Sequence, residues 1–262
     1  MDDRIFGGAF CLLFSSLSAM LIGNPAGPGL LECSVIRTKP SEWSFRAGYL
    51  DDWVYQQHCQ DEFRFEGITR AQTDIRLSTY AALLTLNLKN WVDVYGIVGS
   101  SRMQIDREIF TKRALGWGVG GKLLLFKYGD FFLSTDIKYF ETSQKPRYFV
   151  VNGLPFNIVS NYRLQYRDIQ AALGISYRAW VFAPYAHATY IDTQIEPKPA
   201  KLDVRFPDSD TVTDVESKSI IGIKKWGMAL GLTLAACKKV SLAFEWRAFN
   251  QNAIDVNGEI RF

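Results

Sequence analysis

One segment of the sequence has the spacing of a phosphate-binding loop. Residues 116–122 (Gly-Trp-Gly-Val-Gly-Gly-Lys) carry the glycines and the lysine of such a loop. The next residue is Leu123, where the loop needs Ser or Thr to bind magnesium, and the apolar run that follows is typical of a strand rather than a helix. We therefore interpret these glycines as packing residues of a β-strand and expect no nucleotide site.

Residues suited to acid–base chemistry are few. The chain has two histidines, His58 and His187, and Asp51 and Asp52 are the acidic candidates near His58. A hydrolytic site would need these groups to converge within hydrogen-bond reach. No Ser-His-Asp order, HExxH or CxxC pattern occurs. We expect no catalytic residue, no metal site and no cofactor, and a hydrolase at the rim of a barrel ranks last among the functions considered.

Cysteines give a third possible chemistry. Cys11 lies in an apolar N-terminal run, which leaves Cys33, Cys59 and Cys237 in the rest of the chain. An odd number in an exported protein indicates one disulfide plus a free or intermolecular thiol, and three unpaired thiols are the alternative. These three residues are the disulfide candidates, and Cys33 and Cys237 are expected to bridge each other or neighbouring envelope proteins.

Charged residues elsewhere fall on alternate positions of apolar segments. At the C-terminus, Ile254, Val256, Gly258, Ile260 and Phe262 alternate with Asp255, Asn257, Glu259 and Arg261. Such a period of two predicts a strand with one apolar and one polar face. Ten segments show this pattern: residues 43–56, 74–89, 91–101, 114–127, 131–142, 162–178, 182–195, 218–236, 240–250 and 252–262.

The connections between these segments are sorted by length. Short turns alternate with long polar loops at 57–73, 102–113, 143–161 and 196–217, and only the turn near Asn250 breaks the pattern. A soluble sandwich has no reason to sort its loops in this way. The pattern predicts an all-β fold, a transmembrane antiparallel up-and-down β-barrel of about ten strands, with 8 or 12 strands as alternatives. Both chain termini are expected on the periplasmic side.

Composition agrees with this fold. The 262 residues are 48% hydrophobic and 22% charged, with 7 Trp, 12 Tyr and 18 Phe, and the mean hydropathy is −0.04. A helical membrane protein would need several apolar runs of about 20 residues, and a disordered chain would lack the aromatic residues. The net charge of +3 with mixed signs excludes a nucleic-acid surface.

The N-terminus has the pattern of an exported protein. Residues 5–22 form an uncharged run with small residues near its end, and Pro25 and Pro28 follow. This pattern predicts a signal peptide over residues 1–19, with an uncleaved anchor as the alternative. The expected organisation is a signal peptide (1–19), an N-terminal periplasmic segment (20–42) and an outer-membrane β-barrel (43–262).

Both ends of the predicted mature chain resemble one family. The segments 23–31 (GNPAGPGLL) and 255–262 (DVNGEIRF), with 43–49 (WSFRAGY) and 92–101 (VDVYGIVGSS), are similar to segments of the chlamydial major outer membrane proteins. The resemblance implies a general porin that is cross-linked by disulfides in the envelope. This chain is shorter than typical members and has fewer cysteines, and fewer strands would give a narrower lumen.

The expected function is that of an outer-membrane, porin-like barrel in a Gram-negative bacterium, which passes ions and small solutes and contributes to envelope structure. A non-conducting adhesin or structural barrel is the alternative. Expected partners are outer-membrane lipid, the barrel-assembly machinery, which would read Phe262 as its signal, and copies of the chain or disulfide-linked envelope proteins, but no nucleic acid. The candidate pore-lining residues are Arg46, Lys122, Asp136, Lys138, Asp168, Arg178, Glu245, Arg247, Asp255, Glu259 and Arg261.

Overall fold

The structure is a computed structural model of the chain. It describes residues 23–31, 42–61, 64–65, 68–69, 72–106, 109–151, 154–157, 162–198, 201–205, 212–216, 219–235 and 239–262. The predicted signal peptide (1–19), Cys33 and Cys237 lie outside these residues. Within the described ranges, no helix has the length and apolar character needed to cross a membrane.

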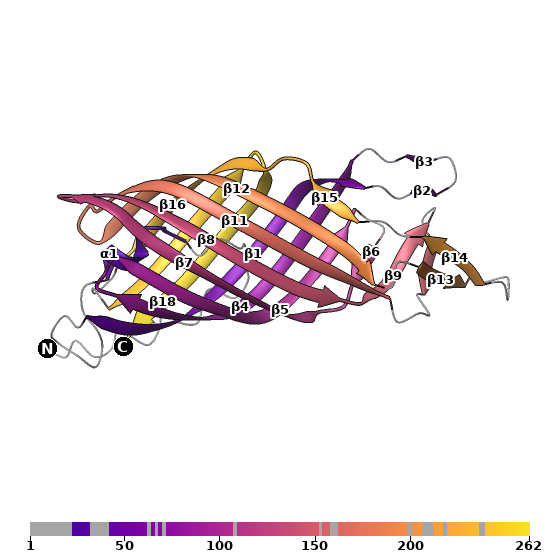
Figure 1. Cartoon of the computed structure of the whole chain (residues 1–262), viewed down its shortest axis with the longest axis horizontal. Coiled ribbons are helices and arrows are strands. Elements are labelled where there is room, and N and C mark those ends of the chain that lie inside the picture. The colour runs from indigo at the N-terminus through magenta and orange to yellow at the C-terminus, as the bar shows by residue number, and fades with distance from the viewer. Residues whose placement is uncertain are drawn as a thin grey trace, which may run out of the picture.

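Ten long antiparallel strands form a closed barrel (Figure 1). They follow one another around the wall in chain order, and pairing of the first with the last closes the ring. This confirms the predicted up-and-down barrel of ten strands. The strands are β1 (Trp43–Asp61), β4 (Thr73–Leu88), β5 (Val92–Ile105), β7 (Ala114–Tyr128), β8 (Phe131–Gln144), β11 (Arg163–Tyr177), β12 (Phe182–Lys198), β16 (Trp226–Leu234), β17 (Val240–Ala248) and β18 (Gln251–Arg261).

Shorter elements belong to the long connections. They are β2 (Arg64–Phe65), β3 (Ile68–Thr69), β6 (Ile109–Thr111), β9 (Pro146–Val151), β10 (Leu154–Asn157), β13 (Lys201–Arg205), β14 (Val212–Glu216) and β15 (Ile220–Gly222). The single strand predicted over 218–236 is wrong, because β15 pairs with β1 and β12 while β16 begins only at Trp226. Residues 223–225 bend the chain between them, where Ile223 bonds to the His58 carbonyl instead of continuing a strand.

The two ends of the barrel differ, as the loop lengths predict. The C-terminus and the short turns after β4, β7, β11 and β16 lie at one end, which we call the short-turn end (Figure 1), whereas the tight turn between β17 and β18 lies on the other side. The turn between β4 and β5 has positive φ at Lys89 and Asn90 (50° and 58°), the backbone of a two-residue hairpin turn. The opposite long-loop end carries β2, β3, β9, β10, β13 and β14.

Side chains alternate between the two faces of the wall. Along β18, the polar residues Asp255, Asn257, Glu259 and Arg261 are buried in the interior, while Ile260 is exposed on the outside. The exposed outer face forms an apolar belt, as expected of a wall that contacts lipid. It includes Phe45, Tyr49, Leu84, Val94, Val98, Leu115, Trp117, Val119, Ile137, Ile169, Leu173, Ile175, Leu230, Leu232, Trp246 and Ile260.

The glycines of β7 make room for large side chains inside the barrel. A Cβ at Gly116 would lie 2.4 Å from the Phe140 ring, and one at Gly120 would lie 2.4 Å from the Tyr95 ring. The loop-like glycine spacing is therefore a packing feature of a strand.

Replacing Gly120 by Ala tests this packing. We expect a loss of about 1–3 kcal/mol of unfolding free energy, because the added methyl group overpacks the interior. The matched control is Gly96→Ala on neighbouring β5, where a Cβ would meet nothing within 4 Å. Unfolding in guanidinium, followed by tryptophan fluorescence, measures both variants. Equal stabilities would contradict the packing role.

Candidate functional site

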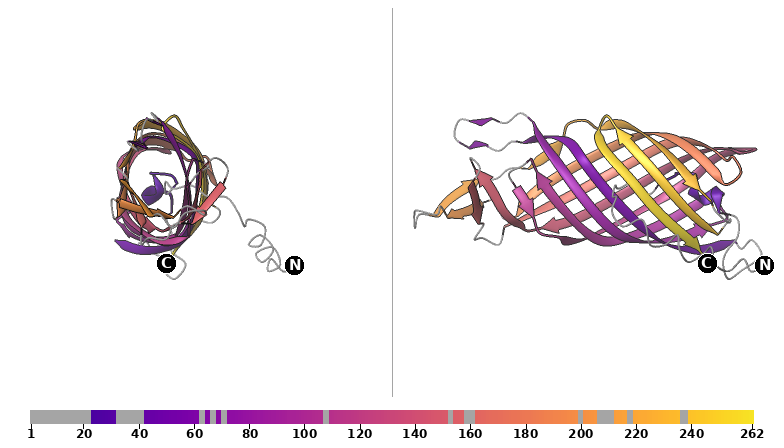
Figure 2. Two further views of the ribbon diagram at one scale, coloured as in Figure 1. Left: turned by 90° about the vertical axis from the view of Figure 1, so that its right-hand side faces the viewer. Right: turned by 180° about the vertical axis from the view of Figure 1, so that it is seen from behind.

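A short N-terminal segment lies inside the barrel at the short-turn end. Residues 23–31, which include the single-turn helix α1 (Gly27–Leu30), lie within the ring of strands (Figure 2, left). The side chain of Asn24 accepts a bond from the Ala26 N–H (2.9 Å) and donates one to Ser176 Oγ (3.0 Å). Ala26 and Leu30 join an apolar cluster with inward residues of β7, β8 and β12. We call residues 23–31 the N-terminal segment.

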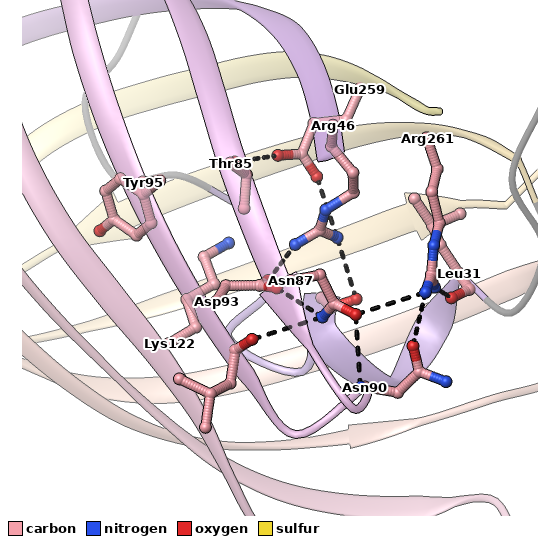
Figure 3. Close-up of polar contacts among 12 residues, drawn as sticks. Leu31, Arg46, Thr85, Asn87, Asn90, Asp93, Tyr95, Lys122, Glu259 and Arg261 are labelled. Carbon is pink, nitrogen blue, oxygen red and sulfur yellow. Dashed lines mark hydrogen bonds and ion pairs between the residues drawn. The ribbon is translucent and has the colours of Figure 1, made fainter. Parts of the chain in front are cut away.

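Four basic side chains at this end of the barrel hold the segment by its main chain. Each donates to a backbone carbonyl oxygen, and cationic donors give stronger hydrogen bonds than neutral ones. Figure 3 shows Arg46 and Arg261 with Asn87, Asn90 and Leu31. The four contacts are Lys122 Nζ to Asn24 O (3.1 Å), Arg46 Nη1 to Gly27 O (3.2 Å), Arg178 to Gly29 O and Arg261 to Leu31 O.

Two acidic residues balance part of this positive charge. Arg46 bonds to Asp93 and lies 3.4 Å from Glu259 Oε2. Asp93 also accepts from Asn87 Nδ2 (2.7 Å), and Glu259 accepts from Thr85 Oγ1 (3.3 Å). A cavity of about 10 Å³, lined in part by Arg46 and Glu259, lies beside the segment and has room for about one water molecule.

A second group of charges lies farther along the lumen. Asp52, Asp255 and Glu245 stand opposite one another on β1, β18 and β17. Arg247 lies 3.6 Å from Asp52 and 3.7 Å from Glu245, and His187 lies 3.6 Å from Glu245. We call the following buried residues the mid-lumen cluster: Asp52, Asp136, Lys138, Asp168, His187, Glu245, Arg247 and Asp255.

Neutral side chains form hydrogen bonds with some of these charged groups. Tyr95 donates to Asp136 (2.6 Å), and Tyr185 donates to Glu245 (3.0 Å). On the other side of the cluster, Thr193 donates to Asp168 (2.9 Å) and Lys138 to Gln170 (3.1 Å).

Other polar atoms of the cluster have no hydrogen bond. Within the described part of the chain, this holds for all three guanidinium nitrogens of Arg247, for both carboxylate oxygens of Asp52 and for both ring nitrogens of His187. Burial without a hydrogen bond costs about 1–3 kcal/mol per group. Contacts of 3.6–3.7 Å are long enough for water to bridge such groups. The geometry is that of a layer of charges that lie at ion-pair distance without direct hydrogen bonds.

Apolar side chains fill another part of the interior. Leu83 and Ile97 face inward at mid-height from β4 and β5, and toward the long-loop end Phe140, Tyr166 and Ile195 join them. All of them are buried. Apolar side chains therefore fill the interior at mid-height beside β4 and β5 and continue toward the long-loop end on strands that also carry charges of the mid-lumen cluster.

The candidate pore-lining residues lie as follows. Ten of them point into the lumen and are at most 7% exposed, and Arg178 follows the end of β11, half-buried beside the N-terminal segment. Asp52, Asp93 and His187 also face inward but were absent from the candidates. The position of Asp93 between the apolar residues Val92 and Val94 is a sequence signal for an inward-facing side chain. Asp52 gives no such signal, because it follows another acid and the alternation of polar and apolar residues is lost there.

The candidates for a rim hydrolase do not converge. Asp52 points into the lumen, whereas Asp51 is on the opposite face of β1, near Tyr49. His58 contacts Asp74 (2.8 Å) and Gln72 (2.8 Å) beyond a bulge in β1. Among the described residues, no group of three or more His, Cys, Asp and Glu is arranged to hold a metal.

Cys59 is buried and free near the long-loop end of β1. It lies beyond Gln57, the last residue of β1 that pairs with β18. Burial, with the nearby carboxylates of Asp168, Asp74 and Asp106, raises the pKa of the Cys59 thiol to about 12.

Comparison with known proteins relates the chain to one group of porins. No family model matches the chain. The major outer membrane porin of Chlamydia trachomatis serovar E is 21% identical over 376 aligned positions, which cover 95% of this chain and 96% of that protein. The porin of Chlamydia abortus is 22% identical over 371 positions, covering 94% and 95%. The chain is similar to the chlamydial major outer membrane porins along nearly its whole length. Because the alignments are longer than 262 residues, those porins carry insertions that this chain lacks.

Solved structures with a similar arrangement are also outer-membrane barrels. The β domain of the Bordetella autotransporter BrkA has a TM-score of 0.44 and 12% identity, covering 85% of this chain and 99% of that one. The translocator domain of NalP from Neisseria meningitidis gives 0.42 and 9%, covering 85% and 88%. The protease OmpT from Escherichia coli gives 0.37 and 11%, covering 84% and 93%. With its closed wall, its apolar belt and its porin relatives, the chain is an outer-membrane β-barrel.

Replacing Asp93 by Asn tests the ion pairs around the N-terminal segment. We expect a loss of about 3–5 kcal/mol of unfolding free energy, because Arg46 stays buried with one of its two acidic partners removed. In the control, Asp192→Asn, the lost partner is Lys225 at 2.9 Å, and both side chains are more than 40% exposed. That pair should contribute less than about 1 kcal/mol. Guanidinium unfolding compares the two, and losses of equal size would contradict the role of Asp93.

Thiol labelling tests the burial of Cys59. In a variant with Cys33→Ser and Cys237→Ser, we expect no reaction with a water-soluble maleimide at pH 8 until the barrel is unfolded. Maleimide reacts with the thiolate, and a thiol with a pKa of about 12 is in that form in about one molecule in ten thousand at pH 8. Ser143→Cys, on the exposed outer face, is the positive control. Rapid labelling of folded Cys59 would contradict the assignment.

Proposed function

We propose that the protein is a porin-type channel with a narrow lumen that its own N-terminal segment closes. In this proposal the short-turn end faces the periplasm. Ions and small solutes pass when the N-terminal segment leaves its site. The relatives are named porins, and the segment is held by hydrogen bonds to its main chain rather than by covalent links. Such bonds can exchange with water at little net cost.

The mid-lumen cluster is the observation that carries this proposal. Its buried charges have polar atoms without hydrogen bonds, and water can supply what they lack. Together with the cations at the short-turn end, they place charged groups from that end to the middle of the lumen. Rings of charged side chains set ion preference in channels. The mid-lumen cluster has five acidic residues and, besides His187, two basic ones, so we expect it to favour cations.

A non-conducting structural or adhesive barrel is the second candidate. The observation that favours it is the filled interior, in which ten of the candidate pore-lining residues are buried. We also propose that the protein is not an enzyme, because Asp51 and Asp52 lie on opposite faces of β1 and His58 contacts Asp74 instead of either of them. Phe262, bonded through its N–H to the Phe45 carbonyl (2.7 Å), is proposed as the assembly signal. Disulfides of Cys33 or Cys237 with envelope proteins, and a homo-oligomer, also remain proposals.

Conductance in planar bilayers separates the two candidates. The variant Lys122→Gln/Arg178→Gln removes two cationic donors to the N-terminal segment, and we expect at least tenfold more time in stepwise open states than for the unmodified protein. The control, Lys89→Gln/Lys127→Gln, removes two exposed cations near the same end, one of which lies 4.0 Å from Glu42 and the other over the Phe132 ring, and should behave as the unmodified protein.

Ion preference provides the second measurement. Replacing Arg247 by Gln removes positive charge from the mid-lumen cluster, so openings should become more cation-selective. Silence of all folded, heat-modifiable variants would favour the non-conducting barrel. Openings whose ion selectivity is unchanged by Arg247→Gln would indicate that the ion path does not pass this cluster.

A further inference from the structure

A row of basic side chains crosses the outer wall near the long-loop end. Arg163 on β11 stands directly opposite Lys198 on β12. Gln144 on β8 pairs with Leu164, so the next residue, Lys145, stands beside Arg163. Ser101 on β5 pairs with Ala114 on β7, so Arg102 stands beside Arg113. A bond from the Lys112 N–H to the Lys145 carbonyl (2.8 Å) joins the two halves.

The members of this row are exposed and point away from the lumen. Their chain neighbours Ser101, Gln144 and Leu164 are buried inside the barrel, and alternation along a strand puts the next side chain on the opposite face. The strands concerned are neighbours on one side of the barrel (Figure 1). We call the following residues the basic row: Arg102, Arg113, Lys145, Arg163 and Lys198.

Like charges at neighbouring positions of a sheet destabilise it. The charges closer to the belt are matched: Arg167 stands opposite Glu141 and lies 3.3 Å from Glu196. In the basic row, Arg102, Lys145 and Arg163 form no ion pair with any described residue, and Arg113 stacks over the Tyr80 ring at 4.5 Å. Lys198 has a distant partner in Glu196 at 3.8 Å. The row therefore gathers positive charge that the described residues leave largely unbalanced.

The basic row lies just above the apolar belt. Arg113 is four positions from Trp117, and Arg102 is four positions from Val98, both of which are exposed belt residues. Four residues of a strand span about 13 Å along its axis, and tilt reduces the height that this represents. Leu115, between Arg113 and Trp117 on the outer face of β7, is itself a belt residue, and the rings of Trp117 and Tyr139, with centroids 5.6 Å apart, lie just below it. An amphiphile with its acyl chains on the belt would place its headgroup at the basic row.

We propose that the basic row binds the phosphate groups of an anionic lipid of the outer leaflet. Adjacent strands are about 4.8 Å apart, so two neighbouring cations can share one phosphate. Arginine fits this role because its planar guanidinium binds phosphate oxygens through two hydrogen bonds. Continuity with the belt favours a membrane lipid over free phosphate. The inference rests on the proposed orientation, with the long-loop end facing outward.

Lipid binding by the full chain in detergent tests this proposal. Native mass spectrometry would count bound molecules of a bis-phosphorylated glucosamine lipid and of its dephosphorylated form. The variant Arg102→Gln/Arg113→Gln/Lys145→Gln/Arg163→Gln should bind the phosphorylated lipid at least tenfold more weakly. The matched control, Lys89→Gln/Lys127→Gln/Lys224→Gln/Lys239→Gln, removes four cations outside the row and should bind as the unmodified protein. Neither substitution should affect the dephosphorylated lipid.

Three outcomes would overturn the proposal: equal loss of binding in both variants, equal binding of both lipids to the unmodified protein, or full competition by millimolar inorganic phosphate. A second variant, with Arg102, Arg113 and Arg163 changed to Lys, keeps the charge and loses the two-pronged contact, so it should bind with intermediate strength. Planar-bilayer conductance should not change in any row variant. Failure of lipid binding with normal conductance would therefore reject this inference alone, whereas silent channels that bind lipid would reject the proposed function alone.

Discussion

Pairing of β1 with β18 is the constraint on which the rest of the structure depends. In hydrocarbon, an unpaired backbone amide or carbonyl costs several kcal/mol, so a membrane sheet must have no free edge. Residues 46–57 pair with residues 251–261, and the wall closes. Closure with only ten strands also sets a narrow interior, which side chains can fill. The charged side chains that point inward must then find partners at close range.

The interior meets this demand in two ways. Near the short-turn end, the cations have good acceptors, because the N-terminal segment supplies carbonyl oxygens and Asp93 and Glu259 supply carboxylates. In the mid-lumen cluster, the partners are farther apart, and several polar atoms have no hydrogen bond within the described residues. The arrangement at the short-turn end is suited to holding the N-terminal segment in place. The mid-lumen cluster is suited to contact with water. A narrow porin-type lumen needs both if it is to open and close.

The outer face is divided by the same alternation. Apolar and aromatic side chains cover the part that contacts lipid acyl chains, and charged side chains follow at the long-loop end. Charges opposite one another are paired in Arg167, Glu141 and Glu196, but the basic row brings like charges together. Because that repulsion costs stability in the isolated chain, it is best understood as part of a surface shaped by the membrane around it.

The sequence by itself determined the strands and their faces. Alternation in 255–262 and nine other segments predicted ten strands, the two classes of connection and the inward position of residues such as Arg46 and Arg247, because a strand's faces follow from its own period. The sequence did not show the interruption of the strand at residues 223–225, the position of residues 23–31 inside the barrel, or contacts such as that of Tyr185 with Glu245. Only the tertiary structure decided these, because strand tilt and closure set which residues of distant strands share one height.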